Sequence, residues 1–387
     1  MWAMTDLHTN PVPPTLAIFC KVVDNYGDIG ICWRLARQLH REHGVAVTLW
    51  VDDLASFQRI CPPLDAQAEE QWQQGVLVRH WRGQDGVFAP AEIAGIVIEF
   101  FGCDIPEGYI AAMAACHPKP VWLNLEGLTA EEWVEGCHTL PSTHPRLPLV
   151  KHFFFPGFTA RTGGLLREAG LDAERRAFQA DPAARLAFLR QLGVSEQEAA
   201  ALTVSLFCYP HAPVGALFSA WKGGATPLTC LVPEGVARDA VAAFLAGGAT
   251  QGALTVRVIP FVPQPDYDRL LWSCDLNFVR GEDSFVRAQW AQRPFVWHIY
   301  PQDENLHHKK LRAFLQRYVG ASGSLNDVAL RWNAATQGED GDWAGLWTAL
   351  HADLPSLRGR AAAWHDEMEK NGEMSANLLA FAASLRH

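Results

Sequence analysis

Short apolar runs alternate with helical stretches in two successive series along this chain, and this pattern limits the possible folds more than any other feature. The first series comprises Leu16–Val23, Val45–Asp53 and the runs "GVLVRHW", "AGIVIEFFG" and "KPVWLNLEGL". Runs that are apolar throughout are typical of parallel strands covered on both faces of a sheet. The stretch Ile29–His43, between the first two runs, has apolar positions at helical spacing. The first half is therefore predicted to be a Rossmann-like sheet of βαβ units.

The alternation starts again at Ala201, after a helical stretch, Ala173–Ala201, that is rich in alanine, arginine, glutamate and glutamine. The second series includes "ALTVSLFCYP", "PLTCLVPEG" and "RPFVWHIYPQ". A chain of 387 residues is also too long for one comfortable hydrophobic core. We therefore predict an α/β protein with two Rossmann-like domains, residues 1–198 and 199–365, and a C-terminal helix at about 366–387 that packs back on the first domain.

The composition argues against several classes of protein. A hydrophobic content of 49% describes an ordinary globular chain, and a formal net charge of −10 argues against wrapping nucleic acid by phosphate neutralisation. The nine cysteines are scattered without a CxxC pair, which favours reduced, buried thiols over disulfides or structural zinc. The N-terminal "MWAMTDLHTNPVPPT" lacks a signal-peptide pattern, and Lys21 breaks the apolar run that follows. We expect a cytoplasmic protein with no nucleic-acid or membrane partner.

The loop "DNYGDIG" follows the first predicted strand and precedes the first predicted helix. It is not a dinucleotide fingerprint, because it supplies only Gly27 and Gly30 and adds two carboxylates, which would repel a diphosphate. Loops at the carboxyl ends of strands nonetheless bind ligands in open α/β sheets, and Asp24 and Asp28 there suit a cationic or proton-donating substrate. An equally weighted alternative is that Asp28 caps the helix and Asp24 stabilises the turn.

A second polar turn, "RGEDS", lies between a predicted strand, Leu276–Val279, and another helix. Free backbone N–H groups at a helix N-terminus bind anions, and Arg280 and Arg287 on either side of the turn could hold phosphate oxygens. Alternatively, Ser284 and the neighbouring carboxylates are caps, and each arginine forms a local ion pair.

Three other features have structural explanations that we favour. The D-x-D pattern, Asp266 to Asp268, follows "PQP" and is better explained as a helix start than as a metal site. The adjacent histidines of "LHHKK" do not share a helix face, so chelation is not expected. Four aromatic residues near predicted strand ends are core residues or stacking partners for a base, and they are Phe207, Tyr209, Phe261 and Tyr267. The chain has neither a G-x-S-x-G elbow nor a P-loop.

Two long motifs, "DNYGDIGICWRLARQL" and "IPFVPQPDYDRLLWSCDLNFVRGEDSFVRAQWAQRPFVWHIYPQ", closely resemble the protein-arginine rhamnosyltransferases that modify bacterial elongation factor P. The resemblance runs over nearly the whole chain. It implies the GT-B fold, in which two Rossmann-like domains face each other across a cleft. It also implies dTDP-β-L-rhamnose as donor, bound mainly by the second half, and elongation factor P as acceptor, bound by the first. The implied product is an inverted, α-linked N-glycoside on one arginine.

The resemblance also implies roles for individual residues. Asp24 and Asp28 correspond to the catalytic aspartates, with Asp28 preferred as the base. Glu282 corresponds to a residue needed for donor handling, and Arg287 to the cation that stabilises the departing diphosphate. We expect no cofactor and no metal, because arginines and a helix N-terminus can supply the positive potential. The substrate-binding residues are expected to be Asn25, Tyr26, Gly27, Phe207, Tyr209, Phe261, Gln264, Tyr267, Arg280, Asp283 and Ser284.

Two other functions remain open on the sequence. The chain could be another GT-B transferase or an epimerase that uses a UDP-sugar. It could also be a non-catalytic protein that binds a translation factor.

Overall fold

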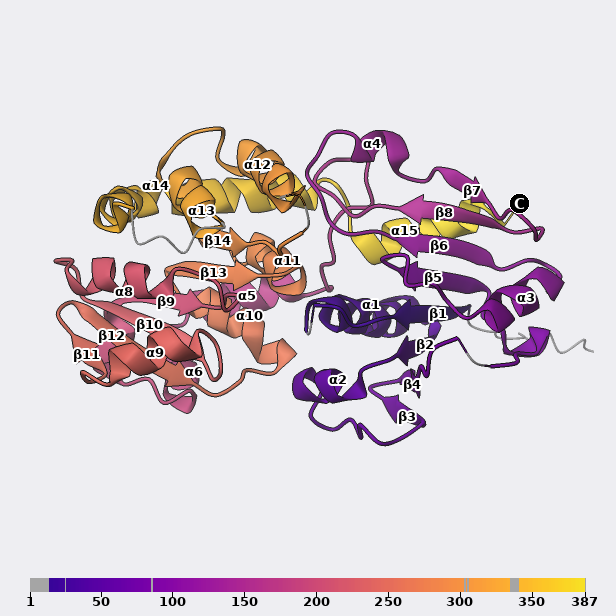
Figure 1. Cartoon of the computed structure of the whole chain (residues 1–387), viewed down its shortest axis with the longest axis horizontal. Helices are drawn as coiled ribbons and strands as arrows, with labels where there is room; N and C mark the ends of the chain where they lie inside the picture. The colour runs from indigo at the N-terminus through magenta and orange to yellow at the C-terminus, as the bar shows by residue number, and fades with distance from the viewer. Residues whose placement is uncertain are drawn as a thin grey trace, which may run out of the picture.

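The computed structural model describes residues 14–24, 26–84, 86–302, 304, 306–334 and 341–386, so most of the N-terminal extension and Asn25 lie outside the described residues. It shows two α/β lobes that lie side by side along the long axis of the molecule (Figure 1). The first lobe, indigo to purple, contains the first half of the chain, and the second lobe, magenta to orange, contains most of the rest. The predicted pair of Rossmann-like units is confirmed.

The first lobe is built on an eight-stranded sheet in the order β3-β4-β2-β1-β5-β6-β8-β7. Its strands are parallel except for β3 and β7, which pair antiparallel with β4 and β8 at the two edges. The strands are β1 (Thr15–Cys20), β2 (Ala46–Val51), β3 (Glu70–Gln73), β4 (Val76–His80), β5 (Ile96–Phe100), β6 (Val121–Leu125), β7 (Pro141–Thr143) and β8 (Val150–Phe154). The helical segments between them are α1 (Gly27–His43), α2 (Leu54–Ile60), η1 (Pro90–Glu92), α3 (Glu107–Ala115) and α4 (Val134–Cys137).

The second lobe is built on a six-stranded sheet in the order β11-β12-β10-β9-β13-β14, parallel except for β11. Its strands are β9 (Leu202–Leu206), β10 (Leu228–Pro233), β11 (Thr250–Gln251), β12 (Leu254–Ile259), β13 (Leu276–Arg280) and β14 (Phe295–His298). Its helices include α8 (Val214–Lys222), α9 (Arg238–Leu245), α10 (Gln264–Ser273), α11 (Asp283–Trp290), α12 (Leu306–Tyr318), α13 (Ser324–Trp332) and α14 (Trp343–Glu369). Since α10 begins at Gln264, the D-x-D pattern lies in its first turns, as predicted.

The helical stretch before the second sheet packs differently from what we expected. Its helices are α5 (Leu171–Gln179), α6 (Pro182–Gln191) and α7 (Glu196–Ala200). Phe188 and Leu189 of α6 share a core cluster with Leu231 of β10 and Leu270 of α10. The predicted boundary at 198/199 assigned this stretch to the first domain, whereas its apolar side chains are buried against the second sheet. The physical reason is that an amphipathic helix packs its apolar side against whichever sheet face is still uncovered, and the order of elements in the sequence does not decide which sheet that is.

The chain returns to the first lobe at its end. After α14, which crosses the second lobe, the last helix α15 (Met374–Ser384) lies on the first sheet (Figure 1). Phe381 of α15 is 5.7 Å from the ring of His152 and 6.3 Å from the ring of Phe154, between ring centroids. This is where we expected residues 366–387 to lie, although α14 extends to Glu369 in the second lobe. In the described part of the chain, no helix has both the length and the apolar character needed to cross a bilayer.

The first strand ends earlier and the first helix begins earlier than the sequence pattern indicated. β1 stops at Cys20 instead of Val23, and α1 begins at Gly27 instead of Ile29. The backbone N–H of Val23 donates to Asp28 Oδ2 at 2.7 Å, so this residue turns toward the helix and does not join the sheet. The polar loop after β1 is therefore short and tightly braced.

Candidate active site

Two adjoining hollows lie between the lobes, at the carboxyl ends of the strands of both sheets. The first, here called the aromatic pocket, has a volume of about 650 Å³ and is open to solvent. Its lining residues come from both lobes and are Asp24, Tyr26, Gly27, Ile60, Phe207, Pro233, Phe261, Val262, Gln264, Tyr267, Arg280, Asp283 and Ser284. Ten of the predicted site residues are therefore brought together in one pocket: Asp24, Tyr26, Gly27, Phe207, Phe261, Gln264, Tyr267, Arg280, Asp283 and Ser284.

The second hollow, here called the acidic cavity, encloses about 1030 Å³ and contains four carboxylates and one lysine. It is lined by Val23, Asp24, Asp28, Phe101, Glu126, Gly127, Leu128, Gly281, Glu282, Trp297, Ile299, Tyr300, Gln302 and Lys310. Asp24 lines both hollows. A group bound in one hollow can therefore meet a group bound in the other beside this carboxylate.

Asp28 both braces the loop and lines the acidic cavity. Its side chain is buried, and Oδ2 accepts backbone N–H bonds from Val23 at 2.7 Å and Asp24 at 2.8 Å. Burial raises the pKa of Asp28, against the two backbone hydrogen bonds that lower it. The alternative that Asp28 caps the helix is wrong, because Asp28 lies inside α1 and no side chain among the described residues caps the start of that helix. Asp28 braces the preceding loop instead, and its raised pKa makes it a better proton acceptor than an exposed aspartate.

Asp24 is held by the opposite lobe. Tyr209 donates its hydroxyl to Asp24 Oδ2 at 2.6 Å. Burial raises the pKa of Asp24, while Tyr209 and Arg280 lower it. A β-carbon at Gly281 would lie 2.6 Å from Asp24 Oδ2, and Gly281 has φ of +63°, so glycine is needed at this position of the "RGEDS" turn. Tyr209 does not line the aromatic pocket, but it orients a carboxylate that does.

Arg280 supplies the positive charge of the aromatic pocket. Its guanidinium carbon lies 4.3 Å from the ring centroid of Phe207 and 5.0 Å from that of Tyr209, and Nη1 donates to the carbonyl of Cys208 at 3.1 Å. Stacking between aromatic faces fixes the guanidinium plane without neutralising its charge. Ser284 Oγ accepts the backbone N–H of Arg280 at 3.1 Å and so closes the turn.

Aromatic rings from the two lobes meet at the pocket. The rings of Tyr26, at the start of α1, and Phe261, after β12, have centroids 5.3 Å apart. Phe207 and Tyr267 are 6.2 Å apart on the second lobe. This arrangement offers flat apolar faces to a planar ligand at the ends of β9 and β12.

Glu282 lies in the acidic cavity with the two aspartates and is not among the residues that line the aromatic pocket. Its Oε1 accepts the backbone N–H of Leu128, in the first lobe, at 3.0 Å. The pKa of Glu282 is raised to about 7, mainly by burial; Asp28 and Asp24 also raise it, and Leu128 and Lys310 lower it. We expected Glu282 to handle the donor, whereas its position associates it with whatever occupies the acidic cavity.

Arg287 does not have the position that we expected for a cation facing a diphosphate. Its side chain is only 1% exposed. Nε and Nη2 donate to the two carboxylate oxygens of Asp268 at 2.7 and 2.8 Å, and Nη1 donates to Glu168 Oε2 at 2.5 Å. Burial lowers the pKa of Arg287, but Asp268 and Glu168 raise it by more. The expectation fails because the buried carboxylate of Asp268 and the half-buried carboxylate of Glu168 occupy the guanidinium, and Arg280 is the cation that faces the pocket.

This ionic group predicts a large loss of stability in an Arg287→Met variant. Removing the cation leaves the buried Asp268 carboxylate without its bidentate partner, which typically costs about 3–5 kcal/mol. Arg82→Met is the matched control, since Arg82 and Glu69 form an ion pair whose side chains are 64% and 62% exposed and whose loss should change the free energy of unfolding very little. Urea unfolding of both variants checks the prediction, and equal losses would contradict it.

Two charged residues of the acidic cavity, Glu126 and Lys310, were not among the predicted site residues. Glu126 directly follows β6, so its place at the carboxyl end of a parallel strand was a usable signal. Burial raises its pKa, and Asn124 donates to its Oε1 at 2.7 Å. Lys310 belongs to α12, in the "LHHKK" stretch that we considered only for its histidines.

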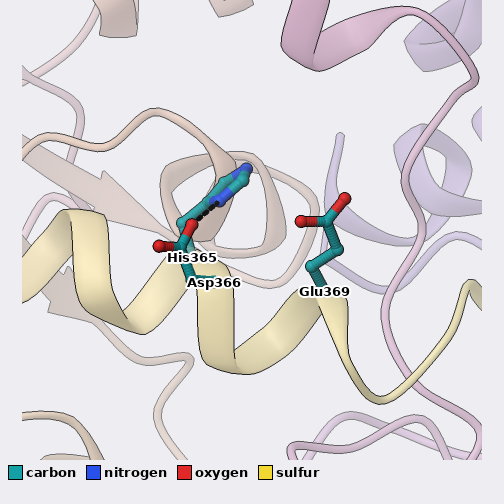
Figure 2. A group of neighbouring side chains, drawn as sticks. All are labelled: His365, Asp366 and Glu369. Carbon is teal, nitrogen blue, oxygen red and sulfur yellow. Dashed lines mark hydrogen bonds and ion pairs between the residues drawn. The ribbon is translucent and has the colours of Figure 1, made fainter.

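Among the described residues, one group of three side chains has the spacing of a metal site, and it lies away from both hollows. His365, Asp366 and Glu369 project from α14, with Glu369 about one turn beyond the other two (Figure 2). His365 Nε2 is already bonded to Asp172 at 2.6 Å, and Arg167 Nη1 donates to Glu369 at 2.7 Å. Two of the three side chains therefore already have partners outside the group.

Comparisons with known proteins agree with this geometry. The family model for the elongation factor P (EF-P) rhamnosyltransferase EarP matches residues 16–383. A protein-arginine rhamnosyltransferase of Pseudomonas putida is 49% identical over 376 residues, which cover 95% of this chain and 98% of that protein. A solved structure described as the basis for EarP-mediated arginine glycosylation of EF-P is 36% identical, covers 96% of this chain and 99% of that chain, and has a TM-score of 0.64. A UGT transferase from Siraitia grosvenorii in complex with UDP, 11% identical over 96% of this chain and 100% of that one, shares the fold with a TM-score of 0.53.

Proposed function

Because this chain belongs to the family of EF-P rhamnosyltransferases, we propose that it transfers L-rhamnose from dTDP-β-L-rhamnose to one arginine side chain of EF-P, with inversion at the sugar carbon. The two Rossmann-like lobes that face each other across the hollows are the GT-B fold expected from the sequence. The acceptor is a translation factor, so the reaction would take place in the cytoplasm.

The junction of the two hollows at Asp24 is the observation that carries the proposal. The aromatic pocket, with ring faces and the Arg280 cation, suits a base and a diphosphate. The acidic cavity, with Asp24, Asp28 and Glu282, suits a guanidinium group, which is planar and cationic and donates up to five hydrogen bonds. A sugar that extends from the pocket would therefore meet the arginine beside Asp24.

The chemistry follows from that placement. A guanidinium nitrogen attacks the anomeric carbon, a C–N bond forms, and the bond from that carbon to the diphosphate oxygen breaks with its electron pair leaving on the diphosphate. Attack from the side opposite the leaving group inverts the carbon. The proton released by the nitrogen passes to Asp28, whose pKa is raised by burial. Arg280 and the backbone N–H groups at the start of α11 stabilise the charge that develops on the diphosphate.

Mass spectrometry of EF-P after incubation with this protein and dTDP-β-L-rhamnose tests the proposal. We expect a mass increase of one deoxyhexose on a single arginine. Parallel incubations with a UDP-sugar show which sugar nucleotide is the donor. We expect dTDP, but not UDP, to protect this protein against thermal unfolding. If EF-P stayed unmodified although this protein bound it tightly, the result would instead favour a non-catalytic binding role.

We also expect the transfer to be independent of metal ions. Arg280 lies at the pocket wall and can take the role of a divalent cation toward the diphosphate. Rates measured with EDTA should match those measured with added magnesium or manganese. A loss of activity in EDTA that manganese restores would contradict this prediction.

A further inference from the structure

Two side chains of the aromatic pocket, Gln264 and Asp283, are held by helix α1 of the opposite lobe. Arg34 Nε donates to Asp283 Oδ1 at 2.8 Å, and Arg37 Nη2 donates to Gln264 Oε1 at 2.6 Å. Gln264 Nε2 in turn donates to the carbonyl of Gly30 at 2.9 Å and to Asp283 Oδ2 at 3.2 Å. The second lobe supplies these pocket residues, but the first lobe fixes their orientation.

The contact between α1 and α11 is very close at this point. A β-carbon at Gly30 would lie 3.0 Å from Asp283 Oδ2 and 3.1 Å from its Cβ. No larger residue fits there without displacing the carboxylate. The backbone of α1 therefore approaches Asp283 directly, and Arg34, one turn further along the helix, reaches the same side chain.

Arg34 is also tied to other acidic groups at the lobe interface. Its side chain is 3% exposed, and Nη1 lies 3.3 Å from Glu168 Oε1 and 3.6 Å from Asp268 Oδ2. Nη2 donates to the backbone carbonyl of Gln264 at 3.3 Å. Such a buried guanidinium has little freedom, so the carboxylate that it holds has a fixed direction.

The charge of Asp283 would oppose the ligand of this pocket. A nucleoside diphosphate is anionic, and the pocket contains two carboxylates, Asp24 and Asp283. An unpaired Asp283 would repel the diphosphate, whereas a carboxylate paired with a guanidinium presents little net charge and keeps acceptor lone pairs for hydroxyl or N–H groups. Compensation by Arg34 therefore makes the pocket acceptable to an anionic donor.

We infer that Arg34 is a positioning residue for the sugar nucleotide, acting from the acceptor-side lobe through the Asp283 carboxylate. The inference rests on the proposed function, in which the aromatic pocket holds the donor. It means that donor affinity depends on contacts between the lobes as well as on the second lobe itself, because the pocket is completed only where α1 meets α10 and α11.

Titration calorimetry with dTDP and dTDP-β-L-rhamnose tests the inference in the full chain. Arg34→Gln should weaken binding about 10- to 100-fold, the range expected for losing a charge-assisted hydrogen bond that orients the site. The KM for EF-P should stay close to its original value. Arg41→Gln is the matched control, since Arg41 is exposed on the same helix and bonds Gln74, and it should leave donor affinity unchanged.

A double-mutant cycle shows whether the effect passes through Asp283. If it does, the Arg34→Gln/Asp283→Asn pair should bind dTDP as tightly as Asp283→Asn alone. If Arg34→Gln does not fold, Arg34→Lys, which keeps the charge but loses Nε–H, should still weaken donor binding. A folded Arg34 variant that loses thermal stability but binds dTDP like the original protein would overturn the inference. Absence of dTDP binding by the original protein would instead overturn the proposed function.

Discussion

An Asp28→Asn variant should lose nearly all turnover while binding dTDP-β-L-rhamnose almost as well as the original protein. The substitution keeps the shape of the side chain but removes the carboxylate that accepts the proton of the attacking guanidinium. Loss of a general base typically costs about 10²–10⁴-fold in rate. Asp28 lines the acidic cavity and not the aromatic pocket, so donor affinity should be preserved. Single-turnover transfer assays and calorimetry with the donor measure the two quantities.

The control for Asp28 must separate proton transfer from bracing of the loop. Asp52 serves this purpose, because its Oδ1 accepts the backbone N–H of Val22 at 2.8 Å and so braces the same loop from β2, yet Asp52 lines neither hollow. Asp52→Asn should leave most of the turnover. If Asp52→Asn were as inactive as Asp28→Asn, or if Asp28→Asn abolished donor binding in a folded protein, the role assigned to Asp28 would be wrong.

The fold could be predicted because its signal is local and repeated. Apolar runs of strand length and the helical spacing of 29–43 depend only on near neighbours in sequence, and both sheets appear where these patterns predicted them. The position of the acidic turn after β1 followed from the same reasoning, because carboxyl ends of parallel strands lie along one edge of a sheet. Strand ends were less well predicted, since the backbone N–H groups of Val22 and Val23 donate to the side chains of Asp52 and Asp28 and not to a neighbouring strand, which shortens β1.

The charged pairs could not be predicted, because their partners are distant in sequence. Arg287 meets Glu168 across 119 positions, and Arg34 meets Asp283 across 249. From sequence, an arginine beside a strand-end turn can face the ligand or the interior equally well. The resemblance to a family pointed to a turn that lines the pocket, but the structure shows that Arg280 faces the pocket whereas Arg287 is paired with Glu168 and Asp268. The assignment of α5–α7 to the second sheet depended on packing in the same way.

Glu282 should give the site a pH dependence near neutrality. Its carboxyl has a pKa raised to about 7 by burial, so a large fraction is protonated at pH 6 and most is charged at pH 8. A charged Glu282 in the acidic cavity attracts the acceptor guanidinium, whereas a protonated one does not. The kcat/KM for EF-P, which reports the free enzyme, should therefore rise with pH through a midpoint near 7. Titrations of kcat/KM at fixed donor concentration measure it.

A Glu282→Gln variant should remove this step and lower kcat/KM for EF-P by about 30- to 1000-fold at pH 8, the range for losing one partner of a buried charge pair.

The free energy of unfolding of the Glu282→Gln variant should rise, although its activity falls. Between the ordinary glutamate pKa and about 7, the folded protein binds more protons at Glu282 than the unfolded chain, so the free energy of unfolding falls as pH rises through this window. Glutamine does not ionise, so its burial does not become less favourable as the pH rises. The variant should therefore gain stability relative to the original protein from pH 5 to pH 8. Glu107→Gln, at an exposed position of α3, should change neither quantity. A Glu282→Gln enzyme that kept its pH step in kcat/KM would show that another group titrates there, and Glu126, which lines the same cavity, would be the next residue to test.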